Sequence, residues 1–90
     1  MNKQIWKYLL MAGRHTVKMP KGAEILTTQS IGDDAFVWAM VNPLNELEDR
    51  HFETFGTGHI IPCNMGVDRK YIGTFQMDGG ALVFHVFERL

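Results

Sequence analysis

The segment Gly56-Thr57-Gly58-His59 holds the residues of this sequence best suited to binding an anion. Its two glycines let backbone N–H groups converge, Thr57 adds a hydroxyl group, and His59 adds a ring donor. No Lys-Ser or Lys-Thr pair follows, so the segment is not a P-loop. We expect either a loop that holds a phosphate or carboxylate, or an ordinary turn or bulge between two strands.

Positive charges flank this segment in the sequence. Arg50 and His51 precede it, and Arg69 and Lys70 follow it at the start of the next expected strand. If the ends of the two flanking strands meet near the loop, we expect these cations to lie beside His59. Phosphate recognition needs such convergent donors. The same residues are also typical of solvated loop charges. The ligand-binding residues predicted from the sequence are Gly56, Thr57, Gly58, His59, Arg50 and Arg69.

The sequence offers little for metal binding or catalysis. Among the four histidines and the one cysteine, the only close pair is His59 and Cys63, without a Cys-x-x-Cys or His-x-His motif. His85 lies between Phe84 and Val86, which is typical of a histidine satisfied by a neighbour rather than of a base. We therefore expect no metal, no cofactor and no catalytic residue. The alternative is a small hydrolase that uses His59 with Cys63 or Asp68.

Two hairpins are the clearest elements that must position these residues. Residues 24–31 and 35–41 flank Gly32-Asp33-Asp34, and residues 71–77 and 81–88 flank Asp78-Gly79-Gly80. Both faces of 35–41 are apolar, which predicts a central strand. Further strands are expected at 5–10, 16–19 and 50–55. The pattern predicts an all-β small sandwich or open barrel of six to seven short antiparallel strands, with an α+β fold carrying one short helix in 43–53 as the alternative.

Composition excludes several classes of protein. The chain has 90 residues, of which 46% are hydrophobic and 11% aromatic, too many for a disordered chain. A net charge of −1 provides no basic field for nucleic acid or an anionic membrane. A single cysteine excludes an intrachain disulfide. We expect one domain over residues 1–90, located in the cytoplasm, without a signal or transmembrane segment. Most aromatic side chains are needed for the core, with Trp6 or Tyr71 the best candidates for stacking on a base.

Several blocks of the sequence together resemble a known group of proteins. These blocks are Ile5-Trp6-Lys7-Tyr8, Met19-Pro20-Lys21-Gly22-Ala23-Glu24-Ile25-Leu26, Trp38-Ala39-Met40-Val41-Asn42-Pro43, Gly56-Thr57-Gly58-His59-Ile60-Ile61-Pro62, Tyr71-Ile72-Gly73-Thr74-Phe75 and Gly79-Gly80-Ala81-Leu82-Val83-Phe84-His85-Val86-Phe87-Glu88. They resemble a family of short phage and prophage proteins of unassigned function, over nearly the whole chain. The chain departs from that family in residues 43–49 and in Cys63-Asn64-Met65-Gly66.

The resemblance implies a viral accessory protein, active in the host cell cytoplasm if phage-encoded. Small phage proteins of this kind often counter bacterial immunity, which makes an anti-defence role the expected one. With the candidate anion loop, this predicts a non-enzymatic protein that binds and sequesters a phosphorylated or nucleotide-derived small molecule. The alternative is an inhibitor that binds a host defence protein through the acidic residues Glu46, Glu48 and Asp49 or through exposed aromatic side chains. A homo-oligomer is expected because a short chain forms a ligand pocket more easily between protomers.

Overall fold

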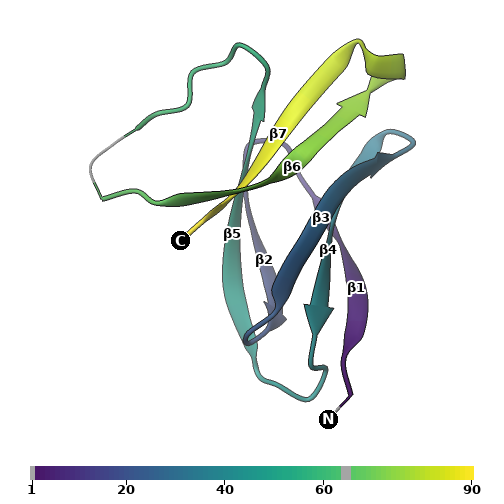
Figure 1. Ribbon diagram of the computed structural model, residues 1–90, viewed down its shortest axis with the longest axis vertical. Helices are drawn as coiled ribbons and strands as arrows, with labels where there is room; N and C mark the ends of the chain where they lie inside the picture. Colours follow the sequence, from purple (N-terminus) through teal and green to yellow (C-terminus); the bar gives the residue numbers. More distant parts are fainter. Residues whose placement is uncertain (1, 64–65) are drawn as a thin grey trace.

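The structure is a computed structural model that describes residues 2–63 and 66–90, and it is all-β (Figure 1). The strands are β1 (Gln4–Leu10), β2 (Arg14–Pro20), β3 (Glu24–Ile31), β4 (Asp34–Val41), β5 (Leu47–Gly56), β6 (Arg69–Met77) and β7 (Leu82–Arg89). The predicted all-β fold is confirmed. The alternative helix in 43–53 is wrong, because β5 begins inside that range and the described helical element is the 3-10 turn η1 (Asp78–Gly80). Within the described residues, no helix is long and apolar enough to cross a membrane.

The seven strands form two antiparallel sheets. Sheet A has the order β1-β4-β3, and sheet B has the order β2-β5-β7-β6. The β3–β4 and β6–β7 hairpins lie where the turn residues predict them, and β4 is central in sheet A, as its two apolar faces predict. Strands β1 and β2 are consecutive in the chain, yet they belong to different sheets. Gly13, with a φ of +76°, lies in the connection between them.

The core lies between the two sheets. Alternate residues of β4 are buried, and the side chains between them are only half-buried. The fully buried side chains Met19, Phe52 and Val86 come from three strands of sheet B and belong to the same apolar cluster as Val37 of β4. Each sheet therefore has one face in the core and one face on the outside.

Strands β3 and β6 bring the two sheets together along one side (Figure 1). Ser30 donates a side-chain hydrogen bond to the backbone carbonyl of Gln76. Gly73 permits this approach, since a Cβ atom there would lie 3.1 Å from Cγ2 of Thr28. β3 and β6 are not paired in a ladder, so the described strands form an open sandwich rather than a closed barrel.

Candidate anion-binding site

The predicted anion loop, residues 56–59, forms a turn at the end of β5 whose amides have partners within the chain. The Thr57 amide donates to the Val83 carbonyl at 3.1 Å, and the His59 amide donates to the Gly56 carbonyl at 3.0 Å. The His59 ring packs on Gly56, where a Cβ atom would come within 2.8 Å of His59 Cε1. Two of the amides expected to hold a ligand are thus engaged in the turn itself.

His85 fixes this loop to the outer face of sheet B. Its Nε2 lies 2.7 Å from Thr57 Oγ1, and its Nδ1 lies 3.0 Å from Thr74 Oγ1. Thr74 Oγ1 in turn contacts the hydroxyl of Tyr71. The prediction that neighbours satisfy His85 is confirmed, and the glycines of the loop serve a turn anchored on the sheet.

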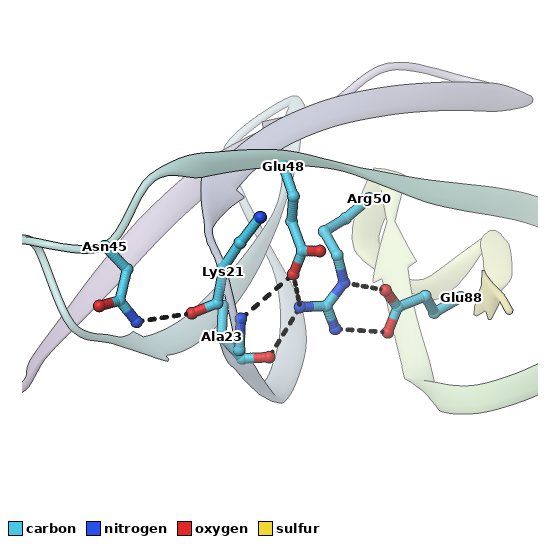
Figure 2. Close-up of polar contacts among 7 residues, drawn as sticks. Lys21, Ala23, Asn45, Glu48, Arg50 and Glu88 are labelled. Carbon is cyan, nitrogen blue, oxygen red and sulfur yellow. Dashed lines mark hydrogen bonds and ion pairs between the residues drawn. The ribbon is translucent and has the colours of Figure 1, made fainter.

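Arg50, predicted as a charge partner of the loop, lies elsewhere. It shares the inward-facing side of β5 with Phe52 and forms a bidentate pair with Glu88, in which Nη2 lies 2.9 Å from Oε1 (Figure 2). Its Nη1 donates to the carbonyl of Ala23 at 2.8 Å. The hydrogen bond to Glu88 raises the pKa of Arg50. Because Gly56 follows six residues later on an extended strand, about 20 Å separates it from Arg50.

The acidic residues around the start of β5, Glu46, Glu48 and Asp49, are paired with nearby groups of the chain. Glu48 accepts a hydrogen bond from the Gly22 amide at 3.1 Å and lies 3.8 Å from Arg50 Nη1 (Figure 2). Asp49 binds Lys18 at 2.9 Å, and this hydrogen bond lowers the pKa of Asp49. Glu46 lies 3.7 Å from Lys21. These residues help to join β5 to β2 and to the turn after β2.

Arg69 is the predicted cation that does lie near the loop region, and it is already neutralised. Its Nε is 2.9 Å from Glu53 Oε1, its Nη2 is 3.5 Å from Oε2, and its Nη1 donates to the Pro62 carbonyl at 2.6 Å. The guanidinium also lies 5.8 Å from the centre of the Phe55 ring. Glu53 is only 6% exposed, so this pair holds the chain after the loop against sheet B.

A cationic pocket that the sequence did not predict lies over β2, β5 and β7. We call it the arginine pocket, and its volume is about 320 Å³. Its lining residues are Arg14, His15, Thr16, His51, Phe52, Glu53 and Arg89. The strand register explains this grouping. Arg14 lies opposite Glu53 in the β2–β5 ladder, and His51 lies between Thr16 and Arg89 in one cross-strand row. Side chains in such rows lie close together on one face of a sheet.

Two guanidinium groups in the arginine pocket are unpaired. Among the described residues, neither Arg14 nor Arg89 has a side-chain hydrogen bond or ion pair, whereas both oxygens of Glu53 are engaged by Arg69. Thr16 Oγ1 lies 3.0 Å from His51 Nδ1. His15 Nδ1 accepts a hydrogen bond of 3.1 Å from the backbone amide of Met11. If the His15 ring is neutral, this bond leaves the proton on its Nε2. The arrangement provides charged and neutral donors for an anion.

On β5, the residue predicted from the sequence as a ligand-binding residue is adjacent to the one that lines this pocket. Alternation along a strand sends Arg50 to the inner face and His51 to the outer face. The prediction selected Arg50 of this pair, while His51 is the one that lines the pocket. Alternation could have indicated that choice, but the meeting of Arg14, His51 and Arg89 depends on pairing between strands far apart in the sequence.

Cys63 is exposed, and its Sγ contacts the carbonyl of Ile61 at 3.5 Å. No hydrogen bond among the described residues joins His59 to Cys63 or Asp68, which the hydrolase alternative requires. In the same part of the chain, no three His, Cys, Asp or Glu side chains are grouped to hold a metal ion. Residues 64 and 65, part of the stretch predicted to differ from the phage proteins that the sequence resembles, lie outside the described residues.

The outer face of sheet A is apolar, in contrast to the cationic pocket on the outer face of sheet B. We call it the apolar face, formed by Ile5, Leu9, Phe36, Trp38 and Met40. The register places Ile5 opposite Met40 and Leu9 opposite Phe36. Ile5 is 57% exposed and Leu9 is 44% exposed, so no described element covers this face. Lys7 adds one cation, 4.6 Å from the centre of the Phe36 ring.

Comparison with known proteins gives one match. The model of the domain of unknown function DUF7352 matches residues 1–90. No curated protein and no solved structure matches the chain at a significant level. Because the family model spans the chain from residue 1 to residue 90, the protein belongs to the DUF7352 family.

Proposed function

We propose that this protein binds a phosphorylated small molecule in the arginine pocket and holds it without transforming it. The observation that carries the proposal is that Arg14 and Arg89 line one pocket and have no partner in the described chain. Arginine side chains pair readily with carboxylates, and the carboxylate beside them, Glu53, is bound to Arg69 instead. A soluble anion is the natural partner for the two remaining guanidinium groups.

The chemistry of the pocket supports a phosphate group in particular. A guanidinium presents two parallel N–H groups that match two oxygens of a phosphate. The hydroxyl of Thr16 and the rings of His15 and His51 supply further polar groups in the same pocket. A phosphate offers several acceptor oxygens and can satisfy donors from more than one strand.

Tyr71 supports a nucleotide-like molecule among the phosphorylated compounds. It is 53% exposed and lies on β6 beside Phe87, one row away from Arg89 along the β6–β7 ladder. Diagonal neighbours of this kind are about 7–8 Å apart. A phosphate held by Arg89 therefore leaves an attached aromatic base within reach of the Tyr71 ring.

The proposal is tested by calorimetric titration and thermal unfolding with inorganic phosphate, pyrophosphate and adenosine monophosphate. Binding to the folded state raises the melting temperature by mass action. We expect binding that is weakened about tenfold by Arg14→Gln or by Arg89→Gln. Lys3→Gln is the matched control, because it removes one exposed positive charge away from the pocket. Absence of heat and of a melting shift with all three anions would contradict the proposal.

The biological use of such binding stays a prediction from the resemblance. Sequestration of a nucleotide-derived immune signal by a phage protein needs tight binding without turnover. Incubation of the protein with the bound compound, followed by recovery of that compound unchanged, tests the second condition. Products that appear in this incubation and are lost with His59→Ala favour the hydrolase alternative instead.

A second candidate function, contact with another protein, has its own observation in the apolar face. Five apolar side chains on two neighbouring strands are left without a covering element, and such patches are typical of interaction surfaces. The expected homo-oligomer is one way to cover them. The mass of the protein in solution, measured for the wild type and for Leu9→Lys, tests this. A dimer that Leu9→Lys converts to a monomer supports the contact, and a monomeric wild type argues against self-association.

A further inference from the structure

The charges that surround the arginine pocket do not balance. Two cross-strand rows on the outer face of sheet B hold Arg14 with Glu53, and Arg89 with Arg69. Among the side chains of these two rows, three guanidinium groups and one carboxylate leave an excess of two positive charges. The next charged pair on this face, Lys18 with Asp49, is neutral in sum and cancels its own charge.

The placement of these charges is unfavourable for an empty site. Arg89 lies directly opposite Arg69 on β6, and like charges in that position destabilise a sheet. Glu53 cannot compensate all three arginines, because Arg69 engages both of its oxygens, at 2.9 and 3.5 Å. A ligand that neutralises the side chains of these two rows therefore brings two negative charges into the pocket.

We infer that the arginine pocket recognises a terminal phosphate, the dianionic group of a phosphomonoester, in preference to a phosphodiester or a carboxylate. This inference rests on the proposed function. A terminal phosphate carries close to two negative charges at neutral pH and has three free oxygens. A phosphodiester carries one charge on two free oxygens, and a carboxylate carries one charge on two. Only the terminal phosphate matches both the excess charge and two separate guanidinium groups.

The inference separates two kinds of nucleotide-derived molecule. Nucleoside monophosphates carry a phosphomonoester, whereas the phosphates of cyclic nucleotides are diesters. Adenosine monophosphate and cyclic adenosine monophosphate share base and sugar, and they differ in the number of charges on the phosphate. Adenosine has neither charge and reports any contribution from the base alone.

The experiment is a calorimetric titration of the full chain with these three compounds and with inorganic phosphate at neutral pH. We expect adenosine monophosphate to bind about tenfold more tightly than its cyclic form, since the cyclic form loses charge-assisted hydrogen bonds. Adenosine is expected not to bind measurably. Arg14→Gln and Arg89→Gln should each bring the ratio between the two nucleotides closer to one, while Lys3→Gln should leave the ratio unchanged.

The outcomes distinguish this inference from the proposed function on which it rests. Equal affinity for the two nucleotides, lost in Arg14→Gln and Arg89→Gln, overturns the preference for a dianion and leaves anion binding in place. Failure of all the anions to bind overturns the proposed function itself. A preference for adenosine monophosphate that both arginine variants retain overturns the assignment to this pocket. Far-ultraviolet circular dichroism of each variant confirms that a loss of binding is not a loss of fold.

Discussion

The four arginines of this chain divide into two pairs that are used in opposite ways. Arg50 and Arg69 each form a bidentate ion pair with a buried glutamate and also donate to a backbone carbonyl. Arg14 and Arg89 line a pocket, and no described side chain is paired with either. Arginine thus stabilises the fold through ion pairs in one region, and in the other region its guanidinium group is free to bind a ligand. Whether an arginine is available to a ligand therefore depends less on its location than on whether a carboxylate of the chain is already paired with it.

The largest effect is expected from breaking the interior pair of Arg50 and Glu88. Glu88→Gln takes from the Arg50 guanidinium, only 18% exposed, the carboxylate of its bidentate pair and leaves only Glu48, at 3.8 Å. A buried charge that loses its partner costs about 3–5 kcal/mol in the free energy of unfolding. Urea denaturation measures this. The double variant Arg50→Met with Glu88→Leu should recover most of the loss, and a double variant as unstable as Glu88→Gln would contradict the argument.

Glu53→Gln is expected to change stability and binding in opposite directions. Removing the carboxylate leaves the Arg69 guanidinium, 11% exposed, without its ion pair, which should lower the free energy of unfolding by about 3 kcal/mol. The same change adds one net positive charge beside the arginine pocket, so affinity for adenosine monophosphate should rise. Parallel denaturation and titration of this variant check both signs. A fall in affinity would show that Glu53 itself helps to hold the ligand.

Gly56→Ala tests whether the glycine loop binds anything beyond itself. An added Cβ would meet the His59 ring at 2.8 Å, so the ring must move, at a cost of about 1 kcal/mol in stability. Because the arginine pocket is not lined by this loop, the affinity for adenosine monophosphate should stay within about twofold of the wild type. His59→Ala should behave in the same way toward the nucleotide. Loss of binding in both variants would return the site to the loop.

The Tyr8 hydroxyl is a buried polar group without a hydrogen-bond partner among the described residues. Unlike the glutamate variants, a variant that lacks this hydroxyl should be slightly more stable than the wild type. Tyr8→Phe should therefore raise the free energy of unfolding by about 0.5 kcal/mol. Burial raises the pKa of Tyr8 above its ordinary value of 10.0. Its neutral form therefore supports the fold fully below about pH 10, and this support is lost as the pH rises further. Denaturation at neutral and alkaline pH should show that Tyr8→Phe lacks this alkaline loss, and a destabilised variant at neutral pH would contradict it.

The smallest effect on stability is expected at the unpaired arginines. Arg89→Gln removes a like charge opposite Arg69, so the free energy of unfolding should stay within about 0.5 kcal/mol of the wild type or rise slightly. Urea denaturation without added anions checks this. A loss comparable to that of Glu88→Gln would mean that Arg89 has a structural partner, and the division into two pairs would fail.

Much of the fold follows from local patterns in the sequence. The turn residues Gly32-Asp33-Asp34 and Asp78-Gly79-Gly80 locate both hairpins, and the two apolar faces of residues 35–41 identify a central strand. The passage of the chain from β1 in one sheet to β2 in the other was not predicted, because it depends on which distant strand each one pairs with. The pairing of β2 with β5 brings together residues more than 25 positions apart, and no local signal specifies it.

The site was harder to predict for the same reason. Arginine, glycine and histidine were predicted as the residue types that bind an anion, but pairing decides which arginine side chains are free. Arg50 lies one residue from the pocket in sequence and on the opposite face in space. Arg69 was expected near the loop and does contact Pro62, but its charge is matched by Glu53, whose role depends on the three-dimensional register.

The most direct test of the account follows the four arginine side chains separately. Their Nε–Hε signals in a nitrogen–proton correlation spectrum, assigned with single Arg→Gln variants, can be recorded while adenosine monophosphate is added. We expect the signals of Arg14 and Arg89 to move with the ligand and those of Arg50 and Arg69 to stay in place. Movement of the Arg50 and Arg69 signals, with Arg14 and Arg89 unchanged, would contradict the division of the arginines into paired and unpaired side chains.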